Sequence, residues 1–420
     1  MSLASILNQK RRPLADNAVN ITSAEFKADP YPFYARLRAE APVFRVTLPD
    51  RQAAWLVTRY DDVSRVLKDE GFAKDRLNAL TPEQLAKQPW IPGFFKPLMR
   101  NMLDLDGLDH DRLRALVQKA FTPRLVEQMR PRIQKLTEDL LDALQTRNEV
   151  DLIRDYALPL PTTVIAQMLG VPVEDRHKFH RWSKALFLTS ASRWGILKAI
   201  PNVWQFIRYI RKLLAARRVA PQDDLISALV QVEEDGERLS EDELLAMVML
   251  LLVAGHETTV NLIGNGMLAL LEHPDEMERL RSDPALIKPA VEELLRFHSP
   301  VEMATERFPR EDTAVAGVTI PRGEMVLAVL ASANRDERQF VDPDRLDLTR
   351  EPNRHLSFGQ GVHFCLGAPL ARLEGQLAIN TLLRRTSGIR LAVPPAALRW
   401  RRGMVVRGVE ALPLAVTKWK

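Results

Sequence analysis

The stretch that decides the fold of this chain is Ser357-Phe358-Gly359-Gln360-Gly361-Val362-His363-Phe364-Cys365-Leu366-Gly367. It contains the only cysteine among 420 residues, and a helix-like run over residues 368–385 follows it. The glycines at 359, 361 and 367 allow the backbone to take positive φ and to approach a flat ligand closely. Cys365 stands just before the helix, where unpaired amide N–H groups favour its thiolate, which is a soft ligand for iron.

A lone cysteine has two other common roles, as a small buried hydrophobic side chain or as a catalytic nucleophile. The sequence offers no oriented histidine and acid to activate a nucleophile. The spacing Phe-Gly-x-Gly-x-His-x-Cys-x-Gly resembles the haem-ligand loop of the cytochrome P-450 family. This resemblance implies that the cofactor is haem b and that Cys365 is the ligand of its iron. It also implies contacts to the cofactor from Phe358, Gly359, His363 and Gly367.

Composition describes an ordinary soluble globular protein, with 46% hydrophobic and 27% charged residues. The formal net charge of +5 favours basic patches over nucleic-acid binding. One cysteine excludes an intrachain disulfide and fits a reducing cytoplasm. Residues 1–20 show no signal peptide, and the most apolar run, residues 244–255, has about half the length that a bilayer requires. We therefore expect a cytoplasmic protein without a stable membrane anchor.

Helical patterns cover most of the chain as far as residue 296, and short alternating segments typical of strands follow. Helices are predicted over residues 31–40, 61–68, 123–147, 159–169, 174–188, 196–218 and 240–271, and strands over residues 53–58, 313–320, 325–330, 389–391 and 403–406. Residues 78–100 carry four prolines and are predicted to form a long irregular loop. The pattern predicts one domain over residues 1–420, mostly α with a smaller β-rich part (α+β). The resemblance implies the cytochrome P-450 fold, with residues 78–100 covering the substrate pocket.

The longest predicted helix carries a second motif, Ala254-Gly255-His256-Glu257-Thr258-Thr259. Ser240 and Glu243 have the spacing of a capping box at its start. The Thr258 hydroxyl is predicted to bond the carbonyl of Ala254, four residues earlier, and the small residues to open a groove for a flat cofactor. The hexad resembles the oxygen-activation motif of the P-450 family. That likeness implies that Ala254 contacts the haem and that Glu257 and Thr258 are the catalytic proton relay.

Two cationic side chains, His110 and Arg114, lie four residues apart and are expected on one face of a helix. Two such donors suit carboxylates, although each could equally be a solvated surface charge. By resemblance to the P-450 family, they would hold a haem propionate, with Arg307 and His363 as further donors.

Glu293 and Arg296 can pair on one helical face. Surface pairs of this kind are common and carry little information alone. In this context they resemble the Glu-x-x-Arg pair of the P-450 family, and Arg345 would complete a buried charge triad. The implied role is structural, to fix the loop that presents Cys365.

Together the motifs predict a haem-thiolate monooxygenase that inserts one atom of O2 into a C–H bond, by hydroxylation or epoxidation. One alternative is a peroxide-driven or isomerising haem-thiolate enzyme, which usually lacks the acid–threonine pair. Another is a non-catalytic carrier of haem or an apolar ligand, which would not require that pair. The substrate is expected to be a hydrophobic small molecule, because the candidate wall segments are mostly apolar. These segments are residues 90–102, 186–204, 249–254, 301–304 and 405–406.

The sequence contains no flavin- or dinucleotide-binding unit, so no fused reductase is expected. Electrons are expected from a separate acidic ferredoxin, itself reduced by an NAD(P)H-dependent reductase. The positive charges predicted near Cys365 would attract such a donor. These charges are Arg112, Lys119, Arg354 and Arg372.

Overall fold

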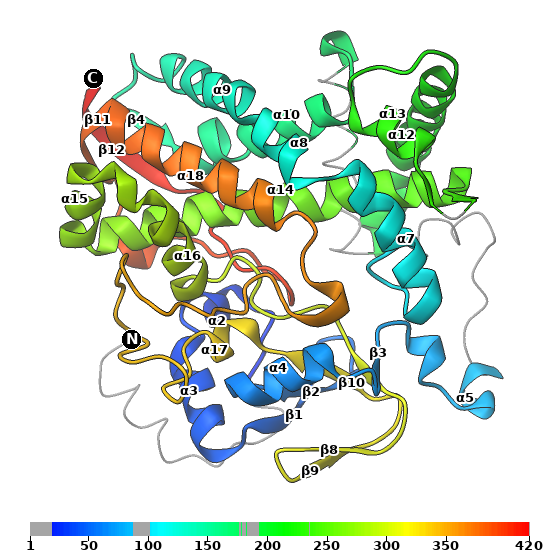
Figure 1. The fold of residues 1–420 in the computed structure, drawn as a ribbon. Helices are drawn as coiled ribbons and strands as arrows, with labels where there is room; N and C mark the ends of the chain where they lie inside the picture. The colour runs from blue at the N-terminus through cyan, green and yellow to red at the C-terminus, as the bar shows by residue number, and fades with distance from the viewer. Residues whose placement is uncertain are drawn as a thin grey trace.

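The centre of the protein is one long helix, α14 (Glu241–Glu272). A computed structural model describes residues 19–86, 101–175, 193–234 and 236–419, with the single positions 178 and 182 (Figure 1). The predicted capping box is confirmed, because Ser240 accepts from the Glu243 amide and the Glu243 carboxylate accepts from the Ser240 amide. By length and composition α14 is apolar enough to cross a membrane, yet most of its apolar window is buried inside the protein. It is therefore a core helix, as predicted.

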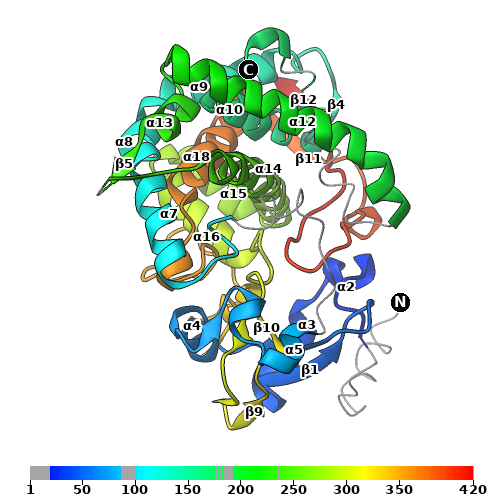
Figure 2. The same cartoon turned by 90° about the vertical axis from the view of Figure 1, so that its right-hand side faces the viewer.

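In the described part of the chain, six helices pack against α14, which Figure 2 shows nearly end-on. They are α10 (Pro159–Met168), α12 (Arg193–Val219), α13 (Leu225–Gln231), α15 (Pro274–Ser282), α16 (Ile287–Phe297) and α18 (Ala368–Arg385). Nearest in the C-terminal half is α18, where a Cβ on Gly375 would lie 2.8 Å from the Leu262 side chain of α14. That glycine allows the two helices to approach closely. The remaining helices are α2 (Ala24–Ala28), α3 (Tyr31–Glu40), α4 (Tyr60–Lys68), α5 (Pro82–Ala86), α7 (Gly107–Ala120), α8 (Pro123–Gln128), α9 (Arg130–Asp142) and α17 (Leu330–Ala333).

The β-rich part is small, and its main sheet lies in the lower part of Figure 1, whereas a second sheet lies at the upper left. The main sheet has the order β1 (Val43–Thr47), β2 (Ala53–Val57) and β10 (Met325–Ala328), with β2 antiparallel to β1 and parallel to β10. The second sheet joins distant parts of the chain in the order β11 (Thr386–Leu391), β12 (Pro413–Trp419) and β4 (Glu149–Asp151). The two-stranded pairs are β3 (Phe72–Ala73) with β7 (Phe308–Pro309), β5 (Glu233–Glu234) with β6 (Glu237–Arg238), and β8 (Thr313–Val315) with β9 (Val318–Ile320). The predicted class, mostly helical with a smaller β part, is confirmed.

Several predicted elements differ from the structure. Residues 313–320 form the antiparallel pair of β8 and β9 in place of one strand. Residues 123–147 form two helices, α8 and α9, because Pro131 occupies the first turn of α9, where its missing N–H is not needed. Residues 403–406 are not a strand and make only an isolated bridge between Val406 and Val301. The predicted loop 78–100 contains the short helix α5, while residues 87–100 lie outside the described part, as do most of residues 176–192.

Candidate active site

The cysteine loop has the backbone that the sequence predicts at two of its three glycines. Gly359 and Gly361 have φ of 69° and 75°, and a Cβ on Gly361 would lie 2.7 Å from the Leu67 carbonyl oxygen. The Cys365 amide donates to the Phe358 carbonyl at 2.9 Å and closes the loop just before α18. Gly367 does not need positive φ, since its φ is −78°. A Cβ there would lie 3.9 Å from the Cys365 sulfur, which is an ordinary van der Waals distance.

Cys365 has an exposed surface, but many protein atoms surround its thiol and limit the hydration of the sulfur. This burial raises the pKa of the thiol. The amides of Gly367 and Ala368 and the nearby cations Arg114 and Arg372 act in the opposite direction, as the helix-start argument predicts. Burial outweighs them, so the fold alone does not provide a thiolate. A coordinated metal ion would deprotonate the sulfur directly.

Basic side chains gather beside this loop. His110 is on α7, and its ring lies 4.3 Å from the His363 ring between centroids. Arg114, one turn further along α7, donates to the Phe364 carbonyl at 2.8 Å. Arg307 is buried nearby, and its backbone pairs with Val326 of β10. The structure thus brings together the four predicted propionate donors from three separate segments.

A fifth basic side chain, Lys74, completes this cluster and was missed by the sequence analysis. Its ammonium is buried, with Asp104 and Glu306 each 4.0 Å away. Burial and the charge of Arg307 lower the pKa of Lys74. Burial, together with Arg307 and His110, lowers the pKa of His363 to about 3. An anionic ligand would stabilise the protonated forms of these basic side chains, so their gathering, with Lys74, His110 and Arg307 buried, favours such a ligand.

Two observations show that these residues fit a flat cofactor with carboxylate arms. The buried His110 Nε2 has no hydrogen-bond partner among the described residues, although its Nδ1 is 2.9 Å from Asp111. Ala254 is exposed on α14, although that helix is mostly buried. The sequence analysis expected Gly255 to help open this face, but it does not. A Cβ on it would lie 2.8 Å from Ile165 of α10, so Gly255 serves helix packing.

The oxygen-activation motif has the predicted local geometry at Thr258, whose Oγ1 donates to the Ala254 carbonyl at 2.8 Å. The neighbouring acid, Glu257, is in an ion pair that the sequence did not predict, with its Oε1 3.2 Å from Arg401 Nη1. His256 is buried, with Nδ1 2.8 Å from the Leu252 carbonyl oxygen, and burial lowers its pKa.

Comparison with known proteins decides the family. The family described as "Cytochrome P450" matches residues 9–388. The chain belongs to the cytochrome P450 family. It is 48% identical to "Cytochrome P450 107B1" of Saccharopolyspora erythraea, over 93% of this chain and 95% of that one.

Solved structures agree with this assignment. The structure of PksS, from the bacillaene polyketide synthase of Bacillus subtilis 168, has a TM-score of 0.89 at 43% identity, covering 95% of this chain and 100% of that one. The myxobacterial CYP267B1 in complex with myristic acid has a TM-score of 0.87 at 46% identity, covering 95% and 98%. This P450 is a haem-thiolate monooxygenase, an oxidoreductase whose cofactor is haem b.

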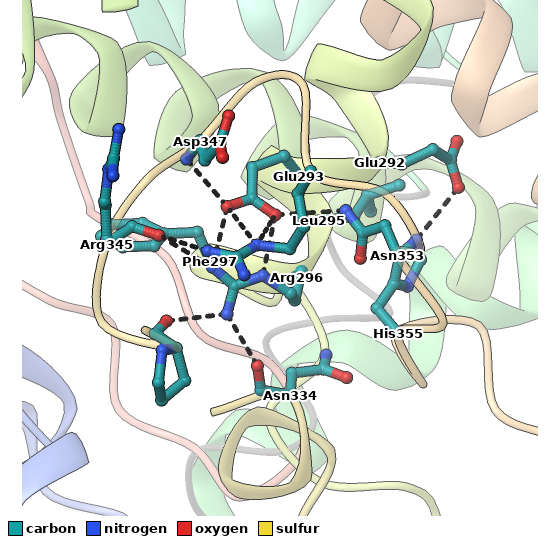
Figure 3. A network of polar contacts seen from close by, with 12 residues as sticks. Glu292, Glu293, Leu295, Arg296, Phe297, Asn334, Arg345, Asp347, Asn353 and His355 are labelled. Atoms are coloured by element: carbon teal, nitrogen blue, oxygen red, sulfur yellow. Dashed lines mark hydrogen bonds and ion pairs between the residues drawn. The ribbon is translucent and has the colours of Figure 1, made fainter. Parts of the chain in front are cut away.

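The Glu-x-x-Arg pair of this P450 is buried, and Figure 3 shows its surroundings. Glu293 accepts from Arg296 Nε at 2.7 Å and Nη2 at 2.8 Å. Arg345 does not complete the triad. Its guanidinium turns away, and only its carbonyl oxygen contacts Arg296, at 3.1 Å (Figure 3). The second guanidinium belongs to Arg350, whose Nε is 3.2 Å from both Glu293 carboxylate oxygens. The prediction of Arg345 was wrong because the path of the backbone over residues 342–350 decides which arginine side chain points towards Glu293.

The face of the P450 near Cys365 is less positive than predicted. Arg112 is paired with Glu243 and, at 3.2 Å, with Glu237. Arg372 makes a two-pronged pair with Glu292, at 2.7 and 2.8 Å. Charges already paired with carboxylates attract an acidic partner weakly.

Proposed function

We propose that Cys365 is the haem ligand and that this enzyme hydroxylates or epoxidises a large apolar molecule, with electrons from a separate acidic ferredoxin. The observation that carries the proposal is the exposed Cys365 at the start of α18 beside five basic side chains, of which Lys74, His110 and Arg307 are buried. When bound, the haem supplies activation of O2. Replacement of Cys365 by Ala is expected to abolish the thiolate-type absorption of the ferrous–CO adduct. If Cys365→Ala kept that long-wavelength band, the assignment of the ligand would be wrong.

The chain's own residues would hold the cofactor by its edges. His110, Arg114, Arg307 and His363 would pair with the propionates, and Lys74 would add a further charge. Phe358, Gly359 and Gly367 would form the wall around the sulfur, and Ala254 the opposite wall. Charge-assisted contacts from buried cations to carboxylates are the strong class of hydrogen bond. Glu293, Arg296 and Arg350 would keep the cysteine loop in place behind this wall.

Glu257 and Thr258 would move protons into the site. Glu257 is partly exposed and can therefore exchange a proton with solvent. The Thr258 hydroxyl donates to the Ala254 carbonyl in this structure, and it would rotate about χ1 to receive the proton and pass one on. The apolar surroundings would exclude other water. This arrangement favours a monooxygenase over the peroxide-driven and non-catalytic alternatives.

The substrate is proposed to be a hydrophobic chain or ring system. Support comes from the apolar wall segments and from two relatives, PksS of a polyketide synthase and CYP267B1 bound to myristic acid. A panel of fatty acids, macrolactones and steroids, scored by the spin-state shift of the ferric haem, would test this. Shifts with polar compounds alone would contradict it.

The donor is proposed to dock where the cysteine loop reaches the surface. Leu108 is 88% exposed and Val362 is 54% exposed, which supports an apolar centre. Lys68, whose Cα lies beside Gly361, and Arg354 are exposed, and neither has a carboxylate partner in the described part of the chain. They replace Arg112 and Arg372 as the charges to test.

Stopped-flow reduction by an acidic ferredoxin at several salt concentrations tests this docking. Lys68→Glu and Arg354→Glu should each slow reduction at low salt, because electrostatic steering is lost. Arg390→Glu is the matched control, since Arg390 follows the far end of α18, about 27 Å away along the helix. Equal rates in all variants at every salt concentration would refute the docking site.

We also propose that the enzyme is cytoplasmic and forms a single catalytic domain over residues 1–420. The buried position of α14 supports the absence of a membrane anchor in the described residues.

A further inference from the structure

The C-terminal loop, defined here as residues 400–409, folds back along one face of α14. It is closed by a bridge between Trp400 and Val409 and by the Arg401 amide, which donates to the Gly408 carbonyl at 2.9 Å. The face that it covers carries Glu257, Asn261 and Asn265, four residues apart. The two ends of the loop are therefore held together by contacts within the loop, apart from its contacts with α14.

Each of these three α14 residues meets the loop. Arg401 pairs with Glu257 at 3.2 Å. A Cβ on Gly408 would lie 2.0 Å from Asn261 Oδ1, so the glycine lets the loop lie against that amide. Asn265 Nδ2 donates to the Arg407 carbonyl at 2.9 Å. The contacts at Asn261 and Asn265 set the distance between the loop and α14. At that distance Arg401 can reach the Glu257 carboxylate.

The tip of the loop is joined to another candidate wall segment. The Val405 carbonyl accepts from the amides of Glu302 and Met303, at 2.8 and 3.2 Å. Val406 forms the bridge with Val301. The loop therefore connects the proposed substrate walls, residues 301–304 and 405–406, with the acid on α14.

The ion pair itself adds little to the stability of the fold. The side chains of Arg401 and Glu257 are 28% and 26% exposed, and pairs open to solvent are weak. Its effect is geometric, because it holds a carboxylate that would otherwise sample several rotamers. The buried His256 is also close to Glu257: burial lowers the pKa of His256 while the charge of Glu257 acts to raise it, and the His256 Nδ1 is 2.8 Å from the Leu252 carbonyl oxygen.

We propose that Arg401 is a positioning residue that holds the Glu257 carboxylate between solvent and Thr258. In one cycle, the Glu257 carboxylate would take a proton from solvent and pass it to the Thr258 Oγ1, which would release its own hydroxyl proton into the site, while Arg401 keeps its proton throughout. This inference rests on the proposed relay role of Glu257. It adds the means by which the relay is aligned, which is one side chain of the C-terminal loop, Arg401.

The test compares Arg401→Gln, Arg401→Lys, Glu257→Gln and the double variant Glu257→Gln/Arg401→Gln. Arg402→Gln is the matched control, because it removes the same charge one residue further along. The substrate probe is the panel compound with the largest spin-state shift, with myristic acid tried first. The measurements are the share of electrons lost to H2O2, the solvent deuterium isotope effect on turnover, the Kd from spin-state titration, and the urea midpoint of unfolding.

We expect Arg401→Gln to lower the coupled product yield by about tenfold, since small misplacements of a catalytic group have large effects. Its Kd and urea midpoint should stay those of the parent, and Arg401→Lys should recover most of the yield. The double variant should match Glu257→Gln alone, because residues that act through one another are not additive. Arg402→Gln should behave as the parent.

Separate outcomes overturn the separate claims. If Glu257→Gln is fully coupled, the relay role of Glu257 fails and the role of Arg401 fails with it. If Glu257→Gln is uncoupled but Arg401→Gln is not, or if the two effects add in the double variant, only the positioning role is wrong. Should Arg401→Gln fold poorly, Arg401→Met, which keeps the apolar stem, carries the same test.

Discussion

Glu374 on α18 offers a quantitative test of the structure. It is 1% exposed, and its Oε2 has no hydrogen-bond partner among the described residues. Burial raises the pKa of this carboxyl from 4.5 to about 8. The folded protein therefore holds a neutral acid at pH 7, whereas the unfolded chain exposes a carboxylate.

The direction of the pH effect follows from proton binding. Between pH 4.5 and about 8 the folded state binds one proton that the unfolded state has lost. Stability from this group is complete below pH 4.5 and is lost as the pH rises towards 8. Each pH unit in this window costs about 1.4 kcal/mol, so the loss at pH 7 is about 3 kcal/mol.

Replacement of Glu374 by Gln removes this titration and keeps the shape. The free energy of unfolding of Glu374→Gln, minus that of the parent, should therefore rise by about 1.4 kcal/mol per pH unit between pH 5 and 7. Urea unfolding of the haem-bound protein, followed by circular dichroism, measures it. The slope is decisive, because any cost of burying the amide is constant with pH. Glu410→Gln, at an exposed position, is the control.

The explanation would be refuted by a difference between Glu374→Gln and the parent that does not change between pH 5 and 7. Such a result would mean that Glu374 stays ionised in the folded protein, with a partner that the described contacts do not include.

Two further predictions concern buried charges. Glu293→Gln should lower the free energy of unfolding by about 3–5 kcal/mol, because Arg296 and Arg350 would keep buried charge without a counter-ion; urea unfolding measures it, and a loss below about 1 kcal/mol would contradict a buried network. Lys74→Met should speed haem transfer to apomyoglobin by about tenfold or more, since a charge-assisted hydrogen bond contributes about 1.5–3 kcal/mol; an unchanged rate would remove Lys74 from the cofactor site.

The sequence predicted best where the signal is local. The capping box of Ser240 and Glu243 and the hydroxyl bond from Thr258 to Ala254 involve residues three or four apart, and both are present. Their partners are fixed by helix geometry once the helix forms. The same holds for α18, which begins just after the cysteine loop.

Predictions failed where the partner comes from a distant segment. Lys74 follows the two-residue strand β3, and no local pattern indicates that Asp104 and Arg307 will surround it. The choice between Arg345 and Arg350 depends on the path of one turn. Such contacts are set by tertiary packing, which the spacing of a single sequence does not encode.

Helix α7 carries side chains whose common face follows from their spacing and one side chain whose partner comes from a distant segment. His110 and Arg114 are four residues apart and face the cysteine loop, whereas Arg112 lies between them and points about 200° away around the helix. Arg112 pairs there with Glu243, the residue that completes the capping box of α14. The pairing attaches α7 to the start of the central helix and so fixes the direction of its cationic face. A charge reversal at Arg112 would disturb that attachment and the cofactor site together. Any loss of electron transfer in such a variant would therefore not identify a docking surface, whereas Lys68 and Arg354 are not involved in this attachment.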